Sequence, residues 1–142
     1  MMKNKHGFTL TEIMVTVIVV GLIAGFAVPN YSNGIKRNHE RDAIAQLTAL
    51  HATNKIFQAQ NQSFFVGSGL SMDQVNTGLG INLIANGKTF SYTSDGATYT
   101  ATFVLSGGSS FTARVTGADL KETGPGGNPC CSIGPCLALP GC

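Results

Sequence analysis

Two groups of residues in this chain could do chemistry: one carboxylate near the N-terminus and four thiols near the C-terminus. Glu12 is the only ionisable residue between Phe8 and Val28, in an otherwise apolar segment. A carboxylate at the centre of a membrane helix costs about 2.5 to 3.5 kcal/mol on insertion scales, so Glu12 needs a cationic partner or a position near the lipid headgroups. The thiols all lie in the tail: Cys130, Cys131, Cys136 and Cys142. An even number of cysteines in a small chain favours disulfides and an oxidising compartment.

The spacing of the four cysteines leaves two disulfide pairings open, because adjacent cysteines seldom pair with each other. One pairing joins Cys130 to Cys136 and Cys131 to Cys142; the other joins Cys130 to Cys142 and Cys131 to Cys136. Closing loops of this size contributes ~3 kcal/mol in the chain-entropy description. A four-thiolate zinc site is the alternative, but the spacing lacks the paired C-x-x-C arrangement of such sites. We therefore predict disulfides, with no metal and no cofactor.

The remaining reactive side chains form no catalytic constellation. His6 precedes the apolar segment, while His39 and His51 lie on a predicted helix. We find no nucleophile motif, phosphate-binding loop or paired metal ligands in the sequence. Nine basic and seven acidic residues give a formal charge of +2, and two of the basic ones precede the apolar segment. Such a balance gives no general attraction for nucleic acid. We predict that the chain is not an enzyme and has no specific nucleic-acid partner.

The segment that carries Glu12 is long enough to span a bilayer. From Phe8 to Val28, a helix with ~1.5 Å rise per residue extends roughly 31 Å. Basic residues before the segment favour a cytoplasmic N-terminus. A secretory signal peptide would be cleaved after its apolar run, but Pro29 follows directly there and disfavours cleavage. The small residue that stands out is Gly7, before the run.

The start of the apolar segment resembles the cleavage and methylation site of type IV prepilins. Residues 5–12 read KHGFTLTE, a short basic leader that ends in glycine, followed by the apolar helix. The resemblance implies that a membrane aspartyl peptidase cuts between Gly7 and Phe8 on the cytoplasmic side, and that Phe8 is then N-methylated. Glu12 is the fifth residue counted from Phe8 and matches the glutamate characteristic of that family.

The resemblance also implies a partner for Glu12. The new amine of Phe8 on one subunit would pair with Glu12 of a neighbour in the low-dielectric interior of a filament, where the attraction selects axial register more than it stabilises folding. Alternatively, residues 9–12 form only a capping box, with Glu12 near the headgroups. Gly21 and Pro29 match the helix-loosening positions of the family, and both are poor in helix interiors. We expect the helix to loosen between them.

The sequence after Pro29 predicts an amphipathic helix that covers a sheet. One apolar stripe, interrupted by Asn54, should pack on the sheet: Ala43, Leu47, Leu50 and Phe57. The opposite face is mostly small and would allow a second helix to approach: Ala45, Ala49, Ala52 and Ile56. The charged cluster from Lys36 to Asp42 is expected to be solvated.

Alternating apolar residues and turn signals predict an antiparallel meander from residue 78 onward. The expected strands are 79–85, 88–93, 97–105 and 110–116, with short connections. The fold class is therefore α+β: a long N-terminal helix, half transmembrane and half amphipathic, packed on an antiparallel β-meander of three to four strands, with a disulfide-held tail. The expected segments are a leader (1–7), a hydrophobic helix (8–29), an amphipathic helix (30–60), a loop (61–77), a sheet (78–116) and a Cys-rich tail (117–142).

The resemblance implies a structural subunit of a type IV pilus. Its partners would be other pilin subunits in a helical homopolymer, the prepilin peptidase and methyltransferase, the inner-membrane pilus assembly machinery, and membrane lipid before assembly. The precursor would be a single-pass inner-membrane protein, and the assembled subunit would lie in an extracellular fibre. Adhesion, motility, DNA uptake and electron transfer all remain open as uses of the fibre.

A pseudopilin of a type II secretion system is the main alternative, because it shares the same N-terminal motif. In major pseudopilins a carboxylate-rich calcium loop closes the C-terminal region, whereas this tail offers only Asp119 and Glu122 among its cysteines. That difference favours a pilin. A third possibility is a single-pass anchored protein that does not assemble.

Overall fold

The computed structural model describes residues 7–106, 111–120, 127–133, 136 and 141–142. The leader residues 1–6 and Glu122 lie outside this part of the chain. The elements are α1 (Leu10–Asn61), β1 (Gly67–Leu70), α2 (Met72–Leu79), β2 (Thr89–Ser94), β3 (Tyr99–Leu105), β4 (Phe111–Thr116) and β5 (Cys130–Ile133). The chain forms two compact units, Met1–Ile35 and Lys36–Cys142, and each is described by itself.

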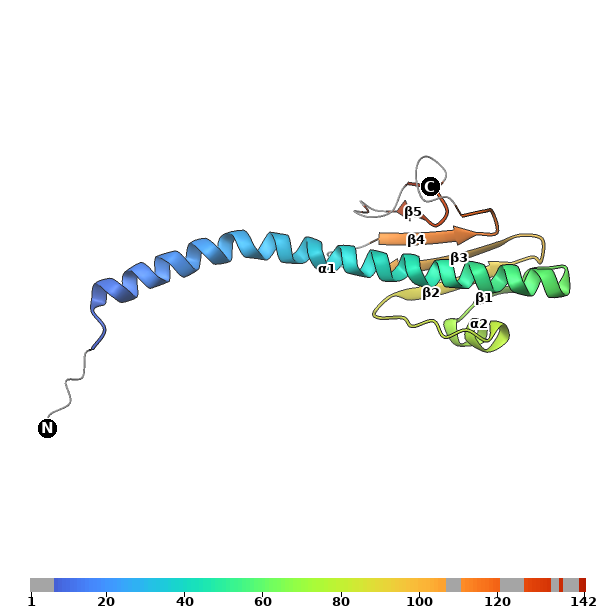
Figure 1. Ribbon diagram of the computed structural model, residues 1–142, viewed down its shortest axis with the longest axis horizontal. Coiled ribbons are helices and arrows are strands. Elements are labelled where there is room, and N and C mark those ends of the chain that lie inside the picture. Colours follow the sequence, from blue (N-terminus) through green and yellow to red (C-terminus); the bar gives the residue numbers. More distant parts are fainter. Residues whose placement is uncertain (1–6, 107–110, 121–126, 134–135, 137–140) are drawn as a thin grey trace, which may run out of the picture. The chain divides into compact units, whose positions relative to one another are not determined.

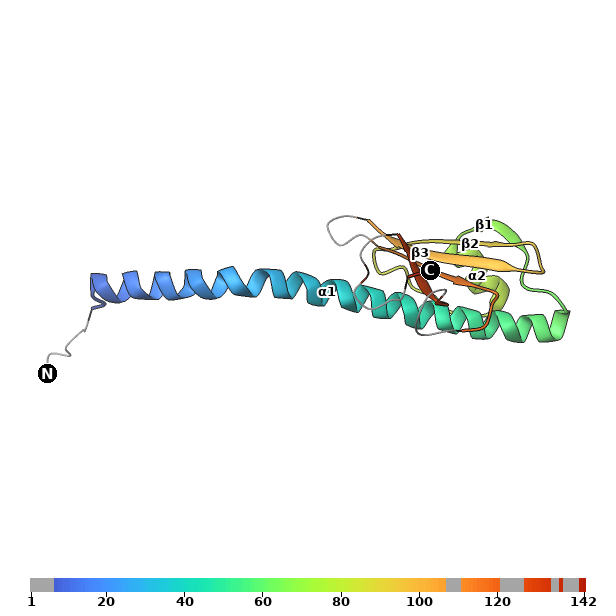
Figure 2. The ribbon, with the colours of Figure 1, turned by 90° about the horizontal axis from the view of Figure 1, so that it is seen from above.

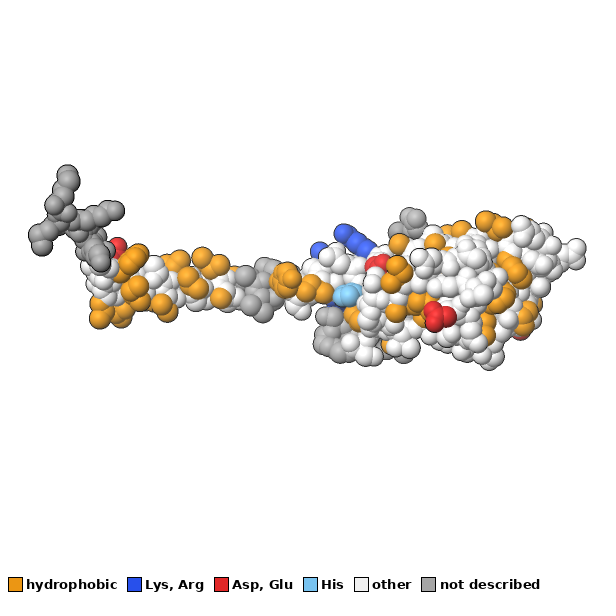
Figure 3. Space-filling model, turned by 90° about the horizontal axis from the view of Figure 1, so that it is seen from below, with side chains coloured by type: hydrophobic (Ala, Val, Ile, Leu, Met, Phe, Trp, Pro, Cys, Tyr) orange, Lys and Arg blue, Asp and Glu red, His pale blue; other side chains and the backbone are white. Residues whose placement is uncertain are grey.

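The first unit contains the N-terminal part of α1, which has no core of its own. Its large apolar side chains are exposed, including Phe8 at 81%, Leu10 at 76% and Phe26 at 76%. Figure 3 shows hydrophobic side chains gathered along this part of the helix. Its most apolar window has a mean hydropathy of 2.3 and none of it is buried, so by length and composition α1 can cross a membrane.

The helix is continuous from Leu10 to Asn61, so Gly21 and Pro29 both lie inside it. A methyl group added at Gly21 would meet nothing within 4 Å in the described chain, which means that no close contact requires glycine there. The single chain thus shows an unbroken helix, and the expected loosening stays a prediction about the assembled state.

The second unit is a five-stranded antiparallel sheet with the C-terminal part of α1 along one face. The strand order is β1-β2-β3-β4-β5, so each strand pairs with its neighbour in sequence. Figure 1 shows the strands side by side, and the view in Figure 2 places α1 against one side of them. This confirms the predicted α+β meander with a helix packed on it.

The predicted apolar stripe of α1 forms half of the core. Ala43, Leu47 and Leu50 are 0% exposed, whereas Phe57 is half-buried. The sheet side of the core lies on alternating positions of β2, β3 and β4: Tyr92, Tyr99, Ala101, Phe103, Phe111, Ala113 and Val115. Residues on the opposite face of the helix are exposed: Ala45, Ala49, Ala52 and Ile56. The predicted division of the helix into two faces is confirmed.

Asn54, which interrupts the stripe, is buried, and both polar atoms of its side chain are hydrogen-bonded. Its Nδ2 donates to Tyr92 Oη at 2.7 Å, and its Oδ1 accepts from the backbone N–H of Phe65 at 3.1 Å. Tyr92 Oη in turn donates to the carbonyl of Phe65 at 2.7 Å. Buried polar groups are tolerated when each has a partner. The amide therefore joins α1, β2 and the chain before β1.

Two of the predicted segments differ from the structure. The expected loop 61–77 contains β1 and most of α2, and α2 begins with a capping box between Ser71 and Gln74. The expected strand 79–85 is wrong, because only the end of α2 and irregular chain occupy it. Its backbone finds side-chain partners instead: Asn76 bonds both the N–H and the carbonyl of Leu83, at 2.8 and 3.1 Å. Burial of Leu83 without a strand explains the misleading alternation.

The charged cluster from Lys36 to Asp42 is solvated only in part: Arg37 and Arg41 are exposed as expected, but other members are buried, contrary to expectation. Glu40 is 0% exposed and Lys36 9%. Asp42 accepts hydrogen bonds from Lys88 Nζ at 2.6 Å and from Asn86 Nδ2 at 3.1 Å. Burial alone would raise the pKa of Asp42, but these bonds hold the pKa below its ordinary value. The carboxylate fixes the chain before β2 onto α1.

Candidate functional site

The N-terminal end of α1 is a capping box built by Thr9 and Glu12. The backbone N–H and the hydroxyl of Thr9 both donate to Glu12 Oε2 at 3.0 Å, and the backbone N–H of Glu12 donates to Thr9 Oγ1 at 3.3 Å. Such reciprocal bonds satisfy donors that the first turn of a helix leaves without partners. The capping box weighed from the sequence is therefore present in the single chain.

The capping box does not use the whole carboxylate. Both hydrogen bonds that Glu12 accepts within the described chain end on Oε2, and an ionised carboxylate has a second oxygen with its own lone pairs. Glu12 is exposed, and Phe8 is 81% exposed. Capping within the chain and pairing with an external amine are thus compatible.

The other residues predicted for this site lie outside the capping box. Gly7 and Phe8 directly precede the capping box, whereas Gly21 and Pro29 lie further along α1. Among the described residues at this end of α1, hydrogen bonds join Thr9 to Glu12. The exposed apolar side chains around them form a surface that water does not favour, and burial of such area is worth about 25 cal/mol per Å².

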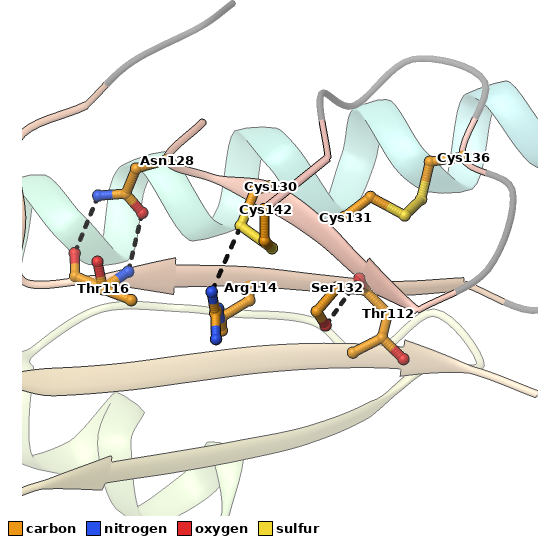
Figure 4. The surroundings of a disulfide bond; sticks show 9 residues. All are labelled: Thr112, Arg114, Thr116, Asn128, Cys130, Cys131, Ser132, Cys136 and Cys142. Carbon is orange, nitrogen blue, oxygen red and sulfur yellow. Dashed lines mark hydrogen bonds between the residues drawn. A yellow bond between two sulfur atoms is a disulfide. The ribbon is translucent and has the colours of Figure 1, made fainter. Parts of the chain in front are cut away.

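The tail cysteines form two disulfides, and the pairing is one of the two left open by the sequence. Cys130 is bonded to Cys142 and Cys131 to Cys136, with Cα separations of 5.0 and 6.2 Å. Figure 4 shows both disulfides beside β4. The sulfurs are thus paired with one another, rather than gathered as the four ligands of a zinc site.

The sequence did not predict that part of the tail joins the sheet as β5. In the register of β4 and β5, Arg114 lies opposite Cys130 and Ala113 opposite Cys131. Buried Asn128 leads into this strand: its Oδ1 accepts from the N–H of Thr116 at 2.9 Å, and its Nδ2 donates to the carbonyl of Ala118 at 2.6 Å. The disulfides therefore tie the C-terminal segment to the sheet.

A second feature that the sequence did not indicate is the buried contact of His51. Its Nδ1 lies 2.7 Å from Tyr99 Oη and 3.2 Å from the carbonyl oxygen of Thr116. Burial lowers the pKa of His51 and raises the pKa of Tyr99. Because the imidazole has structural partners on β3 and at the end of β4, we regard it as a core histidine.

Comparison with known proteins finds one family model that matches the N-terminal part of the chain and several relatives that match less than half of it. The family model of the prokaryotic N-terminal methylation motif matches residues 2–28. The type II secretion system core protein G of Vibrio cholerae is 30% identical over 63 residues, which cover 44% of this chain and 43% of that protein. The type IV major pilin protein PilA of Myxococcus xanthus is 33% identical over 61 residues, 43% of this chain and 28% of that protein.

A fimbrial protein of Pseudomonas aeruginosa is also similar, with 37% identity over 49 residues, 34% of this chain and 32% of that protein. The matched region spans less than half the length of each of these three relatives. The chain thus carries the methylation motif and a pilin-like α+β fold, and it is similar to both pilins and secretion-system core proteins. None of these three relatives is named as an enzyme, in agreement with the expectation that this chain is not one.

Proposed function

We propose that this chain is a structural subunit of a type IV pilus, made as an inner-membrane precursor and polymerised through α1. The precursor is cut between Gly7 and Phe8 by a prepilin peptidase, and Phe8 is N-methylated. The observation that carries the proposal is the apolar surface of the first unit, of which the most hydrophobic window is 0% buried within the chain. Lipid covers that surface before assembly, and neighbouring subunits cover it afterwards.

Glu12 acts at assembly in this proposal. The amine created at Phe8 pairs with Glu12 of a neighbouring subunit, and the carboxylate oxygen outside the capping box receives it. In a low-dielectric filament interior, an unpaired charge is costly, so subunits at the wrong axial register are disfavoured. Thr9 continues to cap the helix in the same arrangement.

The tail supports a pilin over a pseudopilin of a type II secretion system. Two disulfides and the pairing of β5 with β4 close the C-terminal region of the described chain. Within the described residues, no group of three or more His, Cys, Asp or Glu side chains is placed to hold a metal ion. The proposal therefore assigns closure of the C-terminal region to the disulfides and to the pairing of β5 with β4.

The test is to isolate sheared surface filaments and determine the N-terminus of the subunit by mass spectrometry. We expect N-methylated Phe8 as the first residue. An intact Met1, or absence of the chain from the filament fraction, contradicts the proposal. Recovery of the chain only in the membrane fraction, together with loss of protein secretion when its gene is deleted, would favour the pseudopilin alternative.

The role of Glu12 has a matched pair of variants. Glu12→Gln can keep the capping box, because glutamine serves at that position, but it removes the charge. Thr9→Val removes the capping hydroxyl and leaves the carboxylate. We expect Glu12→Gln to lower incorporation into wild-type filaments by roughly tenfold or more, since about 1.4 kcal/mol corresponds to tenfold, and Thr9→Val to have a smaller effect. Equal losses would assign Glu12 to capping alone.

A further inference from the structure

The disulfide Cys130–Cys142 joins a buried residue to an exposed one. Cys130 is 3% exposed, whereas Cys142 is exposed. In the second disulfide, Cys131 and Cys136 are both half-buried. A thiolate from outside can therefore approach the Cys142 end of the first disulfide more readily than the Cys130 end. Attack at Cys142 leaves Cys130 as the departing sulfur.

Arg114 lies against the departing sulfur. Its Nη2 is 4.0 Å from Cys130 Sγ, and the two residues are opposite each other in the register of β4 and β5. Figure 4 shows the guanidinium directed at the Cys130–Cys142 disulfide. Arg114 is also the only charged residue in the five strands that the structure describes. Among the described strand residues, the charged side chain thus lies beside this disulfide.

The guanidinium is poorly satisfied while the disulfide is closed. Arg114 Nε is buried and has no hydrogen-bond partner within the described chain. A neutral disulfide sulfur is a weak acceptor, whereas a thiolate carries a full negative charge. Opening of the disulfide at Cys142 would therefore place an anion where an underused cation already lies. A cationic neighbour stabilises a thiolate, and a better-stabilised thiolate leaves faster.

We propose that Cys130–Cys142 is a thiol-exchange site, at which an external thiolate attacks Cys142 Sγ and Arg114 stabilises Cys130 as the leaving thiolate. A new bond forms between the attacking sulfur and Cys142 Sγ, and the electron pair of the old bond remains on Cys130 Sγ. A second thiolate of the partner then attacks its own sulfur in the mixed disulfide and releases Cys142 as a thiolate. The chain is reduced, and the partner's two thiolates are oxidised to a disulfide.

The partner is a dithiol–disulfide oxidoreductase of the compartment in which the tail folds. The reverse sequence closes the bond, because Cys130 thiolate attacks the mixed disulfide at Cys142 and displaces the partner. Such exchange has a use in this tail, since adjacent Cys130 and Cys131 allow a wrong pairing with Cys136 and Cys142. Stabilisation of the Cys130 thiolate by Arg114 helps Cys130 to leave a wrong bond to Cys136, after which it can form the observed bond to Cys142. This inference does not depend on filament assembly.

The unaltered full-length chain in detergent can show which sulfur of the Cys130–Cys142 disulfide an external thiolate attacks. The folded protein is exposed briefly to reduced glutathione, quenched with N-ethylmaleimide and mapped by peptide mass spectrometry. We expect the first product to carry glutathione on Cys142 and N-ethylmaleimide on Cys130, with Cys131–Cys136 intact. Glutathione on Cys130, or prior opening of Cys131–Cys136, overturns the proposal.

Variants of Arg114 test its role as a positioning residue. R114Q should slow the opening of Cys130–Cys142 by roughly three- to tenfold, while R114K retains most of the rate, because it keeps the cation. Thr112→Val on the same strand is the matched control and should leave the rate unchanged. A purely structural Arg114 would instead lower thermal stability and leave the ratio of the two disulfides' opening rates unaltered. The result on the unaltered chain decides the direction of attack even if R114Q fails to fold.

Discussion

Leu22 and Leu47 belong to the same helix, but their surroundings are opposite. Leu22 is 61% exposed, whereas Leu47 is 0% exposed against the sheet. The sequence around Leu22 is apolar on all sides, while that around Leu47 alternates between apolar and polar faces. A helix that is apolar all round requires a surrounding apolar medium, and a one-sided helix carries its own partner. The first part of α1 therefore needs an apolar environment from outside its own chain, and the second finds its partner in the sheet of the second unit.

The largest expected effect comes from one substitution made in both parts of the helix. Leu47→Ala leaves a cavity in the core and should lower the free energy of unfolding of the second unit by about 2 to 5 kcal/mol. Leu22→Ala removes the same atoms from a side chain without a core and should leave that free energy unchanged. Denaturant unfolding of the full chain in detergent, followed by near-ultraviolet circular dichroism, measures both. Equal losses would contradict the division between the two parts.

The second effect concerns the ion pair that fixes the chain before β2 onto α1. Asp42→Asn removes the charge that faces Lys88 Nζ, whose side chain is 0% exposed. An unpaired buried ammonium is unfavourable, but the carboxylate side chain is 36% exposed and its contribution is reduced by solvent. We expect a loss of about 1 to 3 kcal/mol. Asp73→Asn on α2 is an exposed control that should change the free energy of unfolding little. A loss in this control comparable to that of Asp42→Asn would show that the pair with Lys88 is not the cause.

The third effect is a pH dependence confined to the second unit. Burial holds the pKa of His51 below its ordinary value of 6.5, so the unfolded chain binds this proton more readily than the folded chain. Stability is then full above pH 6.5 and falls as the pH drops from 6.5 toward the pKa of the folded state. Asp42 and Asp95, whose pKa values lie below 3.8 in the folded chain, act only at lower pH.

Thermal unfolding between pH 7.5 and 5 measures this dependence. His51→Gln should flatten the curve in that range, whatever it does to the absolute stability. A slope that persists in His51→Gln would assign the proton to another group. If the two parts of the helix unfold independently, the capping box at Glu12 contributes nothing to the pH dependence of the second unit's stability over this range.

The parts of the second unit that the sequence predicted are those where periodicity reports burial directly. Strands β2, β3 and β4 alternate between core and solvent, and the stripe through Leu47 has a helical period, so both were found. Helix α2 was missed although Ser71 and Gln74 have the spacing of a capping box, because glycine and serine around them suggested a loop. Strand β5 was missed because its pairing depends on distant β4, which a local pattern does not report.

In the candidate sites, too, local contacts could be predicted from the sequence and contacts between distant segments could not. Contact between Thr9 and Glu12 is local, so the capping box could be weighed from the sequence. The choice between two disulfide pairings could not, because both close loops of similar size. The position of Arg114 beside Cys130 required the register of two strands, and the contact of His51 with Tyr99 required the packing of α1 on the sheet. A local sequence pattern does not predict such contacts between distant segments of the chain.

The smallest expected effect tests whether the first part of α1 is built to loosen. A methyl group at Gly21 meets nothing within 4 Å, and the same holds at Gly34, which lies outside the segment between Gly21 and Pro29. Alanine should therefore favour the helix by ~1 kcal/mol at either position without changing the unfolding of the second unit. If loosening between Gly21 and Pro29 serves assembly, only Gly21→Ala should slow incorporation into filaments and reduce their extension under force. Amide hydrogen exchange in detergent should show equal local protection in the two variants, because the intrinsic propensity change is the same. Equal assembly defects in the two variants would mean that helix propensity alone matters and that the position of Gly21 is not important. A defect confined to Gly21→Ala would instead show that the helix must loosen near Gly21 when the subunit assembles with its neighbours.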